Sequence, residues 1–230
     1  MNRVETDGLI FDCRPGTSDE KAVREVVTKR GYARRGFQPR DGETWVDVGA
    51  NIGAFSVWAA ALGCKVVAFE PDPESADLAR HNVTLNGLGR YVAVNTCALT
   101  AEDAGGTATL HCNTARGNVW RNSLHKQWQG GTTITVPTAP MDPYWRRGYH
   151  IKLDAEGSEM PILERYAERP VDRLVFEWSF DIDPDLDRFN RVITKLRRTY
   201  GQVRFSKIAG GHREWQASWF PPCRTVWCDS

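Results

Sequence analysis

The chain has 230 residues, enough for one domain with a sizeable hydrophobic core. Its hydrophobic content of 41%, charged content of 26% and net charge of +1 are ordinary for a globular protein, so bulk charge gives no reason to expect a nucleic-acid or membrane partner. No apolar run is long enough to cross a bilayer, and the N-terminus lacks the apolar region of a signal peptide.

The first 43 residues are predicted to form an N-terminal extension with one strand and one helix. Residues 8–13 favour a short edge strand, and Ser18 or Asp19 begins a helix. Residues 21–40 carry seven basic side chains and one acid, whereas residues 41–80 carry seven acids and two bases. The simpler interpretation of both runs is a solvated face, and the functional alternative is a basic lid over an acidic cofactor pocket.

A nucleotide-binding half-sheet is predicted next. An apolar run that contains Asp47 is followed by a turn with the pattern Gly49-x-Asn51-x-Gly53 and by a helix of small residues, and the next apolar run ends at Glu70. Strand, glycine turn, helix, strand and terminal acid occur in the order that this fold requires. The glycines allow close approach of a ligand, which the N–H groups at the helix start would face.

The turn favours one ligand over the others. A dinucleotide site would have glycine where this chain has Asn51, and its last glycine would come one residue later than Gly53. A carboxylate at Asp47 suits an ammonium group better than a diphosphate. We therefore expect S-adenosyl-L-methionine, with Asp47 at its amine, backbone N–H groups at its carboxylate and Glu70 at its ribose hydroxyls. A tight turn in an ordinary α/β protein is the alternative.

The chain after Glu70 continues the sheet and then departs from it. Pro71 and nearby acids begin a helix that ends near residue 86, and a third strand over 92–95 should bring Ala98 over the adenine. Residues 101–148 are an insertion expected to frame the acceptor pocket, with extra strands over 107–112 and 132–137. Two roles are equally compatible with its tryptophan-rich part, residues 118–146: the aromatic side chains either form a satellite core or face the ligand.

A fourth strand ends at Asp154, at the switch point where ligands of such sheets bind. Glu156 and Glu159 follow it, and one carboxylate of the three is expected to serve as a helix cap. Glu177 lies at the tip of the fifth strand. The remaining elements are predicted as a helix over 186–200 and two strands over 203–206 and 225–228.

The six cysteines contain no Cys-x-x-Cys pair and the five histidines are scattered, which argues against a structural zinc site and a disulfide scaffold. We therefore expect reduced thiols, a cytoplasmic location and no bound metal. Neither repeats nor low-complexity segments divide the chain, so a single domain over residues 1–230 is the simplest organisation. No membrane partner is expected, and the sequence does not reveal the oligomeric state.

Four motifs, in residues 46–53, 68–71, 81–87 and 151–159, resemble the FkbM family of S-adenosylmethionine-dependent methyltransferases. The resemblance implies a Rossmann-like class I fold, that is, a doubly wound, mostly parallel seven-stranded sheet with an antiparallel last strand in a three-layer α/β/α arrangement. It also implies methyl transfer, usually to a hydroxyl of a small molecule or glycan. The residues that match the family's motifs are Asp47, Gly49, Asn51 and Gly53, then Glu70 with Pro71, and finally Asp154, Glu156 and Gly157.

A hydroxyl acceptor needs a base, because it is a poor nucleophile at neutral pH. Asp154 is the first candidate and Glu156 the second, with His125 and His150 as weaker ones. A nucleic-acid methyltransferase is the main alternative function, based on the basic stretch and the aromatics of the insertion. A nicotinamide dehydrogenase and a non-catalytic binding protein of the same fold are weaker alternatives. The acceptor itself is not predicted.

Overall fold

The computed structural model describes residues 1–34, 36–103, 105–113, 121–206 and 223–229. A seven-stranded sheet has the order β11-β12-β10-β9-β3-β4-β5. Its strands are β3 (Thr44–Val48), β4 (Lys65–Phe69), β5 (Val92–Asn95), β9 (His150–Leu153), β10 (Arg173–Ser179), β11 (Gln202–Phe205) and β12 (Cys223–Asp229). The strands from β10 to β5 pair in parallel, whereas β12 runs antiparallel to both β10 and β11. The predicted class I fold is thereby confirmed, and its switch point lies between β3 and β9.

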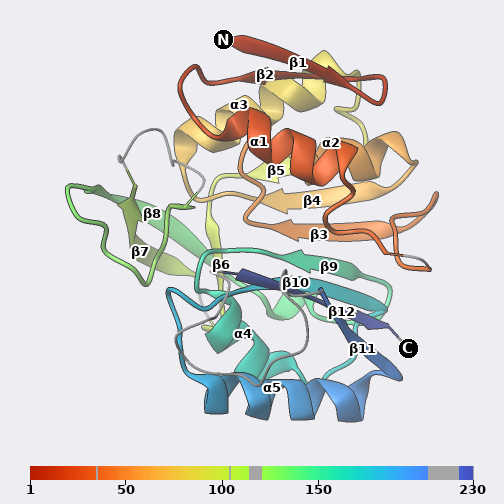
Figure 1. Cartoon of the computed structure of the whole chain (residues 1–230), viewed down its shortest axis with the longest axis vertical. Helices are drawn as coiled ribbons and strands as arrows, with labels where there is room; N and C mark the ends of the chain where they lie inside the picture. Colours follow the sequence, from red (N-terminus) through yellow and green to blue (C-terminus); the bar gives the residue numbers. More distant parts are fainter. Residues whose placement is uncertain (35, 104, 114–120, 207–222, 230) are drawn as a thin grey trace.

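Helices cover both faces of this sheet (Figure 1), and they are α1 (Asp19–Val23), α2 (Ala54–Ala61), α3 (Pro73–Leu85), α4 (Glu159–Tyr166) and α5 (Leu186–Thr199). Alternate residues of β3, β4, β10 and β12 enter different clusters: Trp45 belongs to the cluster with α2, whereas Val46 belongs to the cluster with α4 and α5. This alternation is the expected consequence of a period of two along a strand that is buried on both sides.

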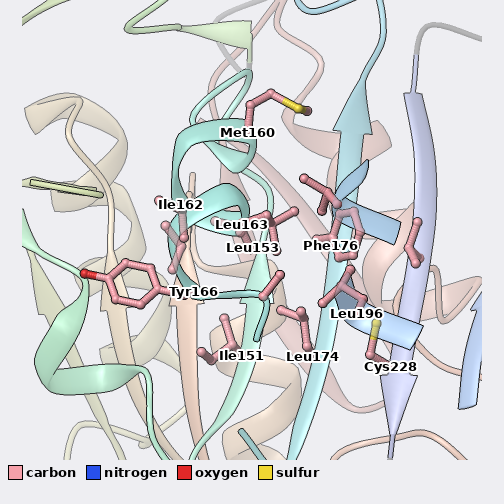
Figure 2. Close-up of a cluster of buried hydrophobic side chains, with 14 of the residues drawn as sticks. Ile151, Leu153, Met160, Ile162, Leu163, Tyr166, Leu174, Phe176, Leu196 and Cys228 are labelled. Atoms are coloured by element: carbon pink, nitrogen blue, oxygen red, sulfur yellow. The ribbon is translucent and has the colours of Figure 1, made fainter. Parts of the chain in front are cut away.

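The cluster beneath α4 is the larger of the two cores. Figure 2 shows side chains from α4, β9, β10, α5 and β12 meeting between the helices and the sheet. Burial of each leucine or isoleucine of this kind contributes about 1.5–3 kcal/mol. The cluster holds β9 and β10 rigidly, so the residues at their carboxyl ends are presented from a fixed scaffold.

The predicted N-terminal strand is present, and the structure adds a second strand that the sequence did not predict. Residues 8–13 contain β2 (Leu9–Cys13), but β2 pairs antiparallel with β1 (Asn2–Thr6) in a separate two-stranded sheet. The outer side of β2 is bonded to helix α3 instead of to another strand: the backbone N–H of Ile10 donates to Asn86 and that of Asp12 donates to Asn82, each over 2.9 Å. Asn82 on α3 and Asn86 directly after it thus form the hydrogen bonds that a neighbouring strand would have made with this edge.

The predicted N-terminal helix consists of two parts. Helix α1 continues directly into a π-helical turn, η1 (Arg24–Thr28), a type of helix that is frequent at functional sites. Ser18 precedes α1 without a side-chain capping bond. Asp19 is fully buried and accepts from the backbone and guanidinium of Arg14, each over 2.9 Å.

The insertion forms a third sheet of order β6-β8-β7, which lies beside the main sheet (Figure 1). Its strands are β6 (Ala98–Thr100), β7 (Gly106–Cys112) and β8 (Thr132–Pro140), followed by a 3₁₀ turn, η4 (Asp142–Tyr144). Trp145 is fully buried against Tyr166, with ring centroids 5.4 Å apart, and both belong to the main core beneath α4 and not to a satellite core. Trp120 lies outside the described residues. Across the described ranges, every helix is too short or too polar to cross a membrane.

Candidate active site

A cavity of about 340 Å³ lies at the carboxyl ends of the central strands. One end is lined by the turns after β3 and β4 and by the start of β6. The other end is lined by the turn after β9, by the tip of β10 and by the segment that contains α1 and η1. The position agrees with the rule that ligands of doubly wound sheets bind outside the carboxyl ends of the strands at the switch point.

The turn after β3 has the backbone that the sequence pattern predicts. Gly49 has a φ of +76°, and a Cβ atom built on it would lie 1.8 Å from the carbonyl oxygen of Asp154. Only glycine therefore allows β3 and β9 to meet this closely at the switch point. Gly53 has a φ of +84°, and its Cβ would lie 3.2 Å from Ala79 on α3. Asn51 also has a positive φ, of 49°, a conformation that asparagine tolerates better than most residues.

Glu70 lies at the carboxyl end of β4 and lines the cavity. Its two oxygens accept from the backbone N–H groups of Asn51 over 2.8 Å and Asp72 over 2.9 Å. Burial raises the pKa of Glu70 to about 7, although these two hydrogen bonds act in the opposite direction. Pro71 and Ala98 also line this end, together with Leu99, and they form an apolar wall next to the carboxylate.

Asp47 lies behind the cavity, next to a cation of the protein. Its side chain is fully buried and does not line the cavity. One carboxylate oxygen accepts from Ser56 over 2.7 Å, and the other lies 3.1 Å from the Nζ atom of Lys152. A contact between Asp47 and the amine of a cofactor stays a prediction, because this carboxylate already has a cation of the protein as its partner.

Lys152 is a site residue to which the sequence interpretation assigned no role. Its ammonium donates to the carbonyl of Gly49 over 2.7 Å, and lies 3.9 Å from Asp154 in addition to its contact with Asp47. Burial lowers the pKa of Lys152, but the charges of Asp47 and Asp154 outweigh burial, so the net shift is upward and the side chain stays charged. A lysine within the apolar strand Ile151-Lys152-Leu153 is the signal that could have revealed it.

Asp154 lines the cavity at the tip of β9, as predicted. One of its oxygens, Oδ2, accepts from the phenol hydroxyl of Tyr32 over 2.5 Å. The same hydroxyl lies 3.5 Å from a carboxylate oxygen of Glu177 at the tip of β10. Sequence reasoning missed Tyr32, because it lies more than 120 residues from its partner and belongs to no motif.

The two glutamates after Asp154 serve different purposes. Glu156 is buried, lines the cavity and lies 3.4 Å from the guanidinium of Arg121, and burial raises its pKa well above the ordinary range. Glu159 is fully buried and accepts from the backbone N–H groups of Ala155 over 2.5 Å and Gly157 over 2.7 Å. Glu159 thus holds the turn before α4 and does not cap the helix, whose N-cap residue, Ser158, makes no side-chain capping bond.

Neither histidine considered as a base lies in the cavity lining. His150 begins β9 at the opposite end of the strand, where it stacks on Trp45 with ring centroids 5.2 Å apart. The Nε2 atom of His125 lies 3.1 Å from the hydroxyl of Ser158, and burial lowers its pKa. The basic stretch contributes Lys29 to the lining, whereas Arg30 pairs with Asp7 at the surface.

Comparison with known proteins finds one family model and methyltransferases that act on different kinds of acceptor. The model of the methyltransferase FkbM domain matches residues 47–202. The 31-O-demethyl-FK506 methyltransferase FkbM of Streptomyces tacrolimicus is 41% identical over 86 residues, which are 34% of this chain and 30% of that protein. The 23S rRNA (uracil(1939)-C(5))-methyltransferase RlmD of Acidithiobacillus ferrooxidans is 31% identical over 104 residues, 44% of this chain and 22% of that protein. The matches thus span less than a third of these curated relatives.

Solved structures show the fold. A precorrin-8w decarboxylase of Methanobacterium thermoautotrophicum aligns with a TM-score of 0.50 at 13% identity, covering 96% of this chain and 97% of that one. The family match confirms the expected cofactor, S-adenosyl-L-methionine. Because the matched segment spans more than half of the sequence, the chain belongs to the FkbM family of methyltransferases.

Proposed function

We propose that the protein transfers a methyl group from S-adenosyl-L-methionine to a hydroxyl oxygen of a small molecule or glycan. The observation that carries this proposal is that one cavity contains both Glu70, at the tip of β4, and Asp154, at the tip of β9. A buried carboxylate for a diol and a second carboxylate near a reacting hydroxyl are the two groups that the reaction needs from the protein.

The described residues fit the cofactor. Glu70 has two oxygens whose backbone hydrogen bonds leave further acceptor capacity for ribose hydroxyls. Pro71, Ala98 and Leu99 offer an apolar surface suited to adenine. A volume of about 340 Å³ is within the usual range for a ligand of this size. The turn with Gly49, Asn51 and Gly53 would hold the methionine end of the cofactor. Lys152 donates to the carbonyl of Gly49 and is itself paired with Asp47, so both residues stabilise this turn.

When bound, S-adenosylmethionine supplies an electrophilic methyl group, whose bond to sulfur breaks with the electron pair left on sulfur as the acceptor oxygen attacks. The protein must hold the acceptor in line and take its proton. Asp154 is the proposed base, because Oδ2 is bonded to Tyr32 and Oδ1 has no hydrogen-bond donor among the described residues. Glu156 is less suited, since its carboxylate already faces a cation of the protein, the guanidinium of Arg121, over 3.4 Å.

The charges at the acceptor end favour an uncharged hydroxyl over a polyanion. Glu25, Asp154 and Glu177 line this end, and Lys29 is the cation from the basic stretch that accompanies them. Lys29 is largely exposed and lies 3.9 Å from Glu25. A phosphate-rich acceptor would therefore approach Asp154 and Glu177, while the cation beside them, Lys152, is already bonded to Gly49 and paired with Asp47. The similarity to an rRNA methyltransferase nevertheless makes RNA the second acceptor class to test.

Labelled S-adenosylmethionine, carrying tritium in the methyl group, tests the proposal directly. The protein would be incubated with three acceptor pools: small metabolites, a soluble glycan fraction and total RNA. We expect label in the metabolite or glycan pool, as a methyl ether identified by mass spectrometry, and loss of that label with Asp154→Asn. Label confined to RNA would establish the nucleic-acid alternative. Transfer to none of the pools, despite tight binding of S-adenosylhomocysteine, would contradict the proposed reaction.

A further inference from the structure

Tyr32 is held in the cavity by three elements that are far apart in the sequence. Its backbone carbonyl accepts from the indole N–H of Trp227 on β12 over 3.1 Å. Its ring packs edge-on against Phe55 of α2, with centroids 5.8 Å apart. The ammonium of Lys152 lies 5.4 Å from the ring centroid, within the range of a cation–π contact. Contacts from β12, α2 and β9 therefore fix the side chain before any ligand binds.

The hydroxyl of Tyr32 lies between two carboxylates. It is 2.5 Å from Oδ2 of Asp154 and 3.5 Å from Oε2 of Glu177. Burial, followed by the charges of Asp154 and Glu177, raises the pKa of Tyr32 well above its usual value. The phenol therefore keeps its single proton at physiological pH, and the shorter distance shows that this proton is donated to Asp154.

The surroundings show what would happen to Asp154 without this donor. The cation paired with Asp154 is Lys152, whose Nζ atom lies 3.9 Å from Oδ2, and the other charged groups near it in the described part of the chain are carboxylates. Lys152 is already bonded to Gly49 and paired with Asp47, deeper in the sheet. A carboxylate released by Tyr32 would turn towards that buried ammonium, because charge attraction in a partly buried site is strong. Its reach towards the reaction centre would decrease.

We infer that Tyr32 is a positioning residue of the transfer site, which fixes Oδ2 of Asp154 and thereby keeps Oδ1 available for the acceptor's proton. The inference rests on the proposed function, since it assigns to Asp154 the role of base. Tyr32 also lies outside residues 47–202, the segment that matches the family. The N-terminal segment thus contributes a working part of the site, together with Glu25 and Lys29 of the same wall.

The test uses two ligands whose affinities are measured by calorimetry on the full chain. S-adenosylhomocysteine has a neutral sulfur at the reaction centre, whereas sinefungin has a protonated amine there. In Tyr32→Phe we expect sinefungin to bind about tenfold more weakly while S-adenosylhomocysteine changes by less than about twofold, because a retracted carboxylate no longer meets the amine. Tyr149→Phe is the matched control, since the Tyr149 hydroxyl lies 3.3 Å from Arg146 at the surface and outside the cavity lining.

A double-mutant cycle separates positioning from general stability. In an Asp154→Asn background, Tyr32→Phe should leave the ratio of the two affinities unchanged, because the amide that Tyr32 then holds carries no charge to attract the amine of sinefungin. A parallel loss of both ligands with a lower melting temperature would show a merely structural tyrosine and overturn the inference. An unchanged ratio in Tyr32→Phe alone would do the same. These binding ratios need no acceptor, so they remain readable even if the transfer assay contradicts the proposed reaction.

Discussion

The two ends of the cavity are built in different ways. The end at Glu70 is formed by turns that directly follow β3 and β4 and by the start of β6, and its key carboxylate is held by backbone N–H groups. The end at Asp154 is assembled from the N-terminal segment, the insertion, β10 and β12 as well as β9. The contacts at this end are between side chains: the Tyr32 hydroxyl donates to Asp154, and the Arg121 guanidinium lies beside Glu156.

This contrast has a physical cause. A turn that follows a strand fixes its own backbone N–H groups, so a carboxylate bonded to them is placed by local sequence. A contact between two side chains requires that both scaffolds be brought together first, at the cost of ordering long loops. The cofactor end therefore has little freedom to vary, whereas the acceptor end can be altered by changing distant segments. Such a division suits a family whose members share a donor and differ in acceptor.

The largest effect is expected at the point where the two ends meet. Gly49→Ala would place a methyl group on the carbonyl of Asp154 and strain a residue at positive φ. We expect a loss of about 4 kcal/mol or more in the free energy of unfolding and no measurable cofactor binding. Urea unfolding and calorimetry would measure both.

Gly87→Ala is the control for backbone strain alone. Gly87 has a φ of +69°, but a Cβ atom there meets nothing within 4 Å. The loss in the free energy of unfolding should stay at about 1–2 kcal/mol, the cost of an alanine in the left-handed conformation, and the cofactor affinity should be unchanged. If Gly49→Ala and Gly87→Ala lowered the free energy of unfolding equally, the close approach of β3 and β9 would contribute nothing to the effect of Gly49→Ala.

Asp154→Asn tests the acceptor end. The amide can still accept from Tyr32, so the geometry of the site should survive, but it cannot take a proton. We expect turnover to fall by about 10²–10⁴, with a much smaller change in the affinity for S-adenosylhomocysteine. Rates from the labelled-methyl assay, compared with an exposed variant such as Asp187→Asn, would measure this. Normal turnover in Asp154→Asn would remove it from the role of base.

Asp47→Ala addresses the residue whose predicted and observed surroundings differ. Removing it leaves the buried ammonium of Lys152 without its nearest carboxylate, so we expect a loss of about 3 kcal/mol in unfolding free energy. Cofactor affinity should fall by less, about tenfold, because the effect passes through the turn at Gly49. A large loss of affinity with unchanged stability would instead favour direct contact with the cofactor's amine, the role that its sequence position predicts.

Much of the fold could be predicted because its signals are local. The strands at Asp47, Glu70 and Asp154 are apolar runs that end at glycine turns or acids, and the helix before Asn86 has a proline at its start. The hairpin of β1 and β2 could not be predicted in this way, because the side chains of Asn82 and Asn86 take the place of a neighbouring strand. The single-domain organisation stays a prediction.

Part of the cavity lining could also be predicted from the sequence. Gly49, Glu70 and Asp154 were expected close together because strand tips meet at one edge of the sheet, and they line one cavity, while their roles stay predictions. Tyr32 could not be found, since nothing near it in the sequence indicates a carboxylate that lies more than a hundred residues away. Asp47 was assigned to the cavity because its position in the motif says nothing of Lys152, which approaches from a neighbouring strand.

The smallest effect concerns the titration of Glu70, which sets the cofactor end apart from the acceptor end. Burial raises the pKa of Glu70 to about 7, so near neutral pH the carboxyl is partly protonated. An ionised carboxylate accepts hydrogen bonds from ribose hydroxyls more strongly than a neutral one. Affinity for S-adenosylhomocysteine should therefore rise by about five- to tenfold between pH 6 and pH 8, as the ionised fraction increases. Glu70→Gln, which has no charge to gain, should bind weakly and equally at both pH values. A different result would be a wild-type affinity that does not change between pH 6 and pH 8 while Glu70→Gln still binds weakly. Glu70 would then bind the ribose through the geometry of its hydrogen bonds, and its ionisation would have no part in binding.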